Sequence, residues 1–67
     1  MNITINEKPY RIEGGSTIAD ALKEARIANQ FGIAVAVNNV VIAKTEWEKY
    51  IVQKNDNILI INAISGG

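Results

Sequence analysis

The sequence contains no cysteine and no histidine among its 67 residues. Without cysteine, the chain can form neither a disulfide bond nor a nucleophilic thiolate. Without histidine, it lacks the side chain that most often acts as a general acid or base and as a metal ligand. These two absences argue against a stand-alone enzyme and against a metal centre.

An excess of charge of either sign is also missing. Seven Lys and Arg residues balance seven Asp and Glu residues, whereas a nucleic-acid surface needs clustered positive charge. No apolar run approaches the length of a membrane span, and Met1-Asn2-Ile3-Thr4 lacks the basic region and apolar core of a secretory signal. We therefore expect no nucleic-acid partner, no membrane partner and a cytoplasmic location.

The first quarter of the chain predicts a β-hairpin. Ile3-Thr4-Ile5 alternates apolar and polar residues, which is typical of a half-buried strand. Asn6-Glu7-Lys8-Pro9 is expected to form the turn, and the alternation resumes over residues 10–13. Gly14-Gly15 ends the hairpin as a plain turn, since the lysine and wider glycine spacing of a phosphate-binding loop are absent.

A helix is predicted to follow. Thr17 and Asp20 have the spacing of a capping box, with Asp in place of the usual Glu or Gln. Apolar residues recur at helical spacing on one face, at Ile18, Ala21, Leu22 and Ala25. Gly32 is expected to be the stop signal.

The second half predicts more strands. Residues 33–37 form an apolar strand in which Val35 and Val37 are expected to face the core and Ala34 and Ala36 the outside. Asn38-Asn39 is a turn pair before a short strand over residues 40–42.

A short helical segment and a last strand are expected next. The helical turn is expected over residues 45–50, with Thr45 as its N-cap and Trp47 as a packing lid. A polar turn over residues 53–57 leads into a final strand over residues 58–64. A flexible tail, Ser65-Gly66-Gly67, closes the sequence.

These elements predict one α+β domain over residues 1–67. Two hairpins and one main helix fit a mixed sheet of four to five strands, with the first and last strands parallel in its centre. This is the β-grasp, or ubiquitin-like, arrangement. Ile5, Leu22 and Ile60 are expected between helix and sheet.

The whole chain resembles the ThiS family of ubiquitin-like sulfur carriers in thiamine biosynthesis. The matching residues are Ile3-Thr4-Ile5-Asn6, Ser16-Thr17-Ile18, Leu22, Ala34-Val35-Ala36-Val37-Asn38, Val40-Val41, Trp47, Asp56, Ile58 and Gly66-Gly67. The sequence departs from the family pattern at Asn55, where the family usually has glycine. Asn tolerates positive φ better than most residues, so the turn is expected to survive.

The resemblance implies a mechanism centred on Gly67. A ThiF-type enzyme would use ATP to adenylate the Gly67 carboxylate, and a sulfur donor such as a cysteine desulfurase would convert it to a thiocarboxylate. A ThiG-type thiazole synthase would receive the sulfur. The carrier itself would bind no cofactor, and Ser65 and Gly66 would form the narrow tail that enters the partner's site.

Alternation along the last strand predicts a docking face. If Ile58 and Ile60 face the helix, then Leu59, Ile61 and Ala63 point away from it. Ala34 and Ala36 are expected to join this apolar surface, which would hold the activating partner.

Two other functions remain open from the sequence. Gly-Gly also ends the small subunit of molybdopterin synthase and other β-grasp sulfur carriers. A non-catalytic β-grasp interaction module, with an inert tail, belongs to a different class.

Overall fold

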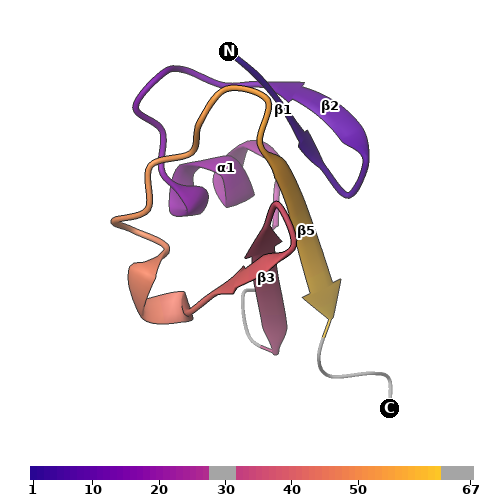
Figure 1. Ribbon diagram of the computed structural model, residues 1–67, viewed down its shortest axis with the longest axis vertical. Coiled ribbons are helices and arrows are strands. Elements are labelled where there is room, and N and C mark those ends of the chain that lie inside the picture. Colours follow the sequence, from indigo (N-terminus) through magenta and orange to yellow (C-terminus); the bar gives the residue numbers. More distant parts are fainter. Residues whose placement is uncertain (28–31, 63–67) are drawn as a thin grey trace.

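The computed structural model describes residues 1–27 and 32–62, and its strands form one five-stranded sheet. The elements in chain order are β1 (Asn2–Ile5), β2 (Lys8–Arg11), α1 (Ile18–Glu24), β3 (Ile33–Val37), β4 (Val40–Ile42), a 3-10 turn (Lys44–Glu46) and β5 (Asn57–Asn62). The sheet order is β2-β1-β5-β3-β4 (Figure 1). β1 and β5 pair in parallel, and the other neighbours pair antiparallel. The predicted β-grasp arrangement is confirmed.

Both hairpins turn through two residues with positive φ. Asn6 and Glu7 have φ of 51° and 69°, and Asn38 and Asn39 have φ of 51° and 71°. Such pairs form the type I′ turns whose twist matches that of the flanking strands. The predicted turn over residues 6–9 is therefore too long. Its last two residues belong to β2, where Pro9 is tolerated because β2 lies at the sheet edge.

The predicted capping box begins α1. The Thr17 hydroxyl accepts a bond from the Asp20 N–H at 3.2 Å, and the Asp20 carboxylate accepts one from the Thr17 N–H at 3.0 Å. The hydrogen bond donated by the Thr17 N–H is the largest cause that lowers the pKa of the exposed Asp20 carboxyl, followed by the Thr17 side chain and then by the charge of Lys23. The helix start is thus fixed by its own first residues.

The helix ends earlier than the sequence predicts. Arg26 has a φ of 61°; its N–H donates to the Lys23 carbonyl at 3.0 Å, and the Ile27 N–H donates to the Leu22 carbonyl at 2.9 Å. This pair of bonds is the Schellman motif, with arginine where glycine is most common. Gly32 is therefore not the stop signal. Ile27 packs against the core edge, as this motif favours.

One buried cluster joins α1 to a single face of the sheet. It contains Ile3, Ile5, Ile12, Ile18, Ala21, Leu22, Val35, Val37, Trp47, Val52 and Ile58. Ile5 and Leu22 lie in it as predicted, whereas Ile60 is only half-buried and packs at its edge. Within the described ranges, no helix is long and apolar enough to cross a membrane.

The segment between β4 and β5 closes the side of this cluster. Trp47 is buried, and its indole N–H donates to the Ile42 carbonyl at 3.0 Å, which confirms the expected packing lid. The N-cap of the 3-10 turn is Ala43, with no side-chain cap, so the prediction of Thr45 as the cap is wrong. Asn55 has a φ of 68°, which confirms that asparagine preserves the expected turn.

Candidate functional site

The candidate site is β5 and the face of the sheet that α1 leaves uncovered. β5 lies in the centre of the sheet between β1 and β3, and it points toward the end of the molecule opposite the N-terminus (Figure 1). Ile58 is fully buried under the helix, while Leu59 and Ile61 are 42% and 44% exposed on the other face. The predicted alternation along this strand is confirmed.

The uncovered face continues across β3 onto β4. Ile61 pairs with Ala34, and Leu59 pairs with Ala36, which in turn pairs with Val41 on β4. Cross-strand partners share a face, so these residues form one surface, called here the outer apolar face: Ala34, Ala36, Val41, Leu59 and Ile61. Val41 is 67% exposed, and the sequence analysis did not include it.

Ala36 corrects one expectation about this face. It lies on the outer side, as predicted, but only 4% of it is exposed. The larger side chains of Leu59 and Val41 flank it directly on both neighbouring strands, and they cover a methyl group that cannot reach beyond them. Ala34 is partly exposed. Ala63 and the tail residues Ser65, Gly66 and Gly67 lie outside the described residues.

Two asparagine side chains bond to β5, one where the strand begins and one in its second half. The Asn38 amide oxygen accepts a bond from the Asn57 N–H at 2.9 Å, where β5 begins. The Asn6 amide oxygen accepts a bond from the Ile60 N–H at 2.8 Å, further along the strand. The sequence analysis treated Asn6 and Asn38 as turn residues or family matches only. Their position in the turns next to β5 could not be known before the strand order.

The beginning of β5 is fixed further by a buried carboxylate. Asp56 is 7% exposed; one of its oxygens accepts a bond from the Asn38 side chain at 2.9 Å and the other from the Gln53 N–H at 2.8 Å. Both carboxylate oxygens are thus committed to structural bonds. Asp56 therefore orders the turn before β5 instead of offering a reactive group.

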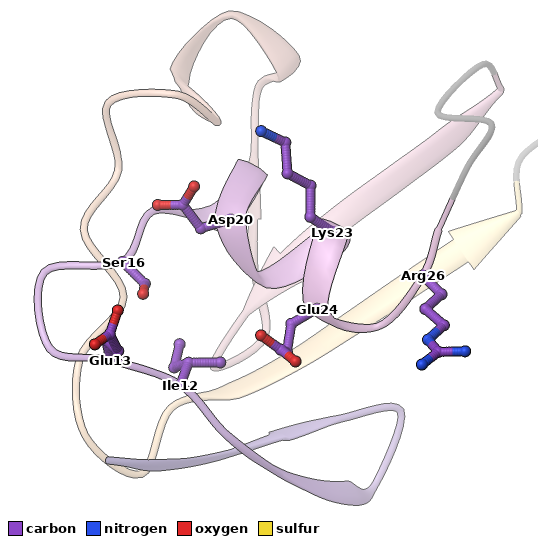
Figure 2. A pocket seen from close by; sticks show the side chains of 7 residues that line it. All are labelled: Ile12, Glu13, Ser16, Asp20, Lys23, Glu24 and Arg26. Carbon is purple, nitrogen blue, oxygen red and sulfur yellow. The ribbon is translucent and has the colours of Figure 1, made fainter.

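A surface hollow beside α1 carries no comparable site. It has a volume of about 460 Å³ and is lined by Ile12, Glu13, Ser16, Asp20, Lys23, Glu24 and Arg26. Figure 2 shows that the amine of Lys23 and the guanidinium of Arg26 point in different directions. The Asp20 carboxylate is already engaged in the capping box. The charged side chains around this hollow carry both signs and do not point at a common centre, so we interpret it as an ordinary solvated surface.

The described part of the chain also lacks a metal-binding cluster. Over residues 1–27 and 32–62, no group of three or more acidic, His or Cys residues could hold a metal ion. Every buried side-chain nitrogen or oxygen in these ranges has a hydrogen-bond partner. What the described residues offer is an exposed apolar surface on and beside the central strand β5.

The fold and the site together define the class of protein. It is a ubiquitin-like β-grasp protein with an outer apolar face and a Gly-Gly end. The family model for the ThiS family matches residues 3–67. The chain is also 31% identical to the sulfur carrier protein ThiS of Escherichia coli strain K12, over 67 residues that cover 100% of both chains. The chain belongs to the ThiS family.

The fold agrees with a solved structure. The crystal structure of the thiamine biosynthesis protein ThiS from Geobacter metallireducens superimposes with a TM-score of 0.82, covering 100% of both chains at 23% sequence identity. At that identity the likeness supports the fold alone. It matches the β-grasp architecture derived from the strand order.

Proposed function

We propose that this chain is a sulfur carrier for thiamine biosynthesis and that Gly67 carries the sulfur as a thiocarboxylate. The observation that carries the proposal is the match to a sulfur carrier over the full length of both chains. The family match also runs through Gly67 itself. The same proposal makes the chain a substrate of partner enzymes rather than an enzyme.

The proposed chemistry takes place on one carboxylate. A carboxylate at neutral pH is a poor electrophile, so a ThiF-type partner uses ATP to form an acyl-adenylate and releases pyrophosphate. A sulfur nucleophile then attacks the carbonyl carbon, and AMP leaves. When the nucleophile is a persulfide, as on a cysteine desulfurase, a thiol must then reduce the acyl disulfide to give the thiocarboxylate. A ThiG-type thiazole synthase accepts the sulfur.

The carrier's own contribution in this scheme is presentation. Glycine has no Cβ, so Gly66 and Gly67 suit a narrow, water-excluded channel where a partner stabilises the developing charge. The outer apolar face lies on the strand that leads to these glycines. We propose that it docks the partner while the tail enters the active site.

Intact mass of the protein purified from its own cells tests the proposal. We expect a fraction heavier by the difference between sulfur and oxygen, and that fraction should react with iodoacetamide. Because the chain has no cysteine, alkylation under mild conditions reports the thiocarboxylate, whereas oxidation of the single methionine gives a similar mass without alkylation. A complete absence of alkylated protein in cells with active partners would favour an inert interaction module.

Ile61→Arg tests the docking face. Placing a charge in the outer apolar face should weaken binding to the activating enzyme by more than about tenfold, or roughly 1.4 kcal/mol. Ile51→Arg is the matched control, because Ile51 and Ile61 are almost equally exposed, at 45% and 44%. Ile51 is not part of the outer apolar face, since it pairs with Thr17 at the start of α1.

Isothermal titration and thermal melts of the same preparations decide this prediction. The control should bind like the wild type, and both variants should remain folded. Equal affinities of Ile61→Arg and Ile51→Arg, or unfolding of the first alone, would show that this face is not the docking surface.

A further inference from the structure

The parallel pairing between β1 and β5 stops before β5 ends. Its register pairs Thr4 with Asn57 and Ile5 with Ile58. Asn6 then turns the chain toward β2 with a φ of 51°, whereas β5 continues to Asn62. Among residues 1–27 and 32–62, no strand thus lies beside the second half of β5 on the β1 side.

The side chain of Asn6 fills part of this gap. In a parallel ladder, a residue bonds to the two residues that flank its partner on the neighbouring strand. Asn6 begins that pattern, since its N–H donates to the Ile58 carbonyl at 2.9 Å. The regular continuation would join the Ile60 N–H to the main-chain carbonyl of Asn6. The Ile60 N–H instead donates to the Asn6 amide oxygen at 2.8 Å.

The amide of Asn6 therefore acts in place of its own peptide carbonyl. The backbone turns into the hairpin, and the ladder still advances by one bond along β5. On its other edge, β5 pairs antiparallel with β3, where Ile60 lies opposite Val35. Successive N–H groups of a strand point to opposite edges, and the Ile60 N–H points to the Asn6 side. Without the Asn6 amide, this exposed N–H loses its acceptor within the protein and is left to water.

We infer that Asn6 is a positioning residue for the carrier's reactive end. It fixes β5 as far as Ile60 on the β1 side, while β3 holds the other edge as far as Asn62, and so it helps to set the direction from which the chain continues to Gly67. This inference rests on the proposed function, because the direction of β5 matters to chemistry only if a partner must receive the Gly67 carboxylate. The two bonds of Asn6, to Ile58 and to Ile60, lie on either side of Leu59. They therefore also order the strand that carries part of the outer apolar face.

Three variants separate this role from simple stabilisation. Asn6→Gly keeps the left-handed backbone conformation and removes the acceptor. Asn6→Asp keeps both the acceptor oxygen and a residue type that tolerates this conformation. Asn38→Gly is the control for lost stability, because Asn38 also has a φ of 51° and its side chain bonds both the Asn57 N–H, where β5 begins, and the buried Asp56 carboxylate. This variant therefore loses one bond more than Asn6→Gly, but at the end of β5 remote from Gly67.

Two measurements read the result. By amide hydrogen exchange, Ile60 should exchange about tenfold faster in Asn6→Gly than in the wild type, the upper range for loss of one hydrogen bond. With the activating enzyme, kcat for ATP–pyrophosphate exchange should fall by about tenfold or more, since small misplacements of a reacting group are costly. The KM for ATP should stay unchanged. Asn6→Asp should restore both readouts, and Asn38→Gly should keep the wild-type kcat.

Each contrary result would overturn a different step of the inference. An unchanged Ile60 exchange rate in Asn6→Gly overturns the inference at the hydrogen bond. Fast Ile60 exchange with the same kcat as Asn38→Gly overturns it at the tail, and Asn6 then only stabilises the sheet. If Asn6→Gly does not fold, exchange in the unaltered chain decides: protection of Ile60 supports the bond, and free exchange overturns it. Absence of pyrophosphate exchange in the wild type would instead overturn the proposed function.

Discussion

We expect the variant that lacks Gly67 to lose ATP–pyrophosphate exchange with the activating enzyme while it keeps the wild-type fold. Removing one residue shortens an extended chain by roughly 3.3–3.6 Å. Reacting atoms must lie about 3–3.5 Å apart, and a misplacement of about 1 Å already costs about 100-fold in rate. Adding one residue after Gly67 displaces the carboxylate by a similar distance in the other direction. It should therefore abolish exchange as well.

The fold should survive because the chain's known core does not depend on Gly67. Among the described residues, the buried members of the core lie between Ile3 and Ile58. Circular dichroism of both length variants should match the wild type. Ser65→Ala is the matched control, since it changes the tail without changing its length, and it should retain exchange. Wild-type exchange in the deletion variant would refute the proposed mechanism.

Much of the fold could be predicted because local signals agree with the sheet topology. Turn-forming residues predicted the position of both hairpin turns, the first of them two residues too long, and the structure places positive φ at Asn38 and Asn39. The spacing of Ile18 and Leu22 predicted the buried helix face, and both residues are 0% exposed. These features depend on a few neighbouring residues and on period alone. The order of the predicted elements then indicated that the first and last strands pair in parallel in the centre of the sheet, as the structure shows.

The misses have two physical causes: a local backbone conformation that the residue type does not favour, and contacts between distant parts of the chain. The early end of α1 places Arg26 in the left-handed region, which its residue type alone does not favour. Ala36 is buried only because the neighbouring strands present larger side chains on both sides of it. The Asn6 side chain finds its acceptor role 54 residues away, at Ile60. No local pattern encodes these distances.

The candidate site divides in the same way. Alternation along the last strand correctly predicted which face Leu59 and Ile61 occupy. The extension of that face to Val41 required the register of β3 with β4. The role of Gly67 came from the resemblance rather than from composition. It remains a proposal with its own test.

Leu22→Ala should leave the protein partly unfolded at room temperature. Leu22 is 0% exposed and lies in the cluster between α1 and the sheet. Truncating a buried leucine to alanine costs about 2–5 kcal/mol, because the lost apolar contacts are joined by the cost of a cavity. Domains are stable by only about 5–15 kcal/mol, and one of this size belongs near the low end because it buries a smaller share of its surface.

The chain's other leucine provides the matched control for this substitution. Leu59 is 42% exposed on the outer apolar face, so Leu59→Ala removes the same atoms without opening a buried cavity. One kcal/mol shifts the thermal midpoint of such a domain by about 4–8 °C, and Leu22→Ala should therefore melt more than about 8 °C below the wild type, whereas Leu59→Ala should stay near it. Equal midpoints for the two variants would show that α1 does not pack on the sheet through Leu22. The same truncation lowers the midpoint much more at a buried position than at an exposed one.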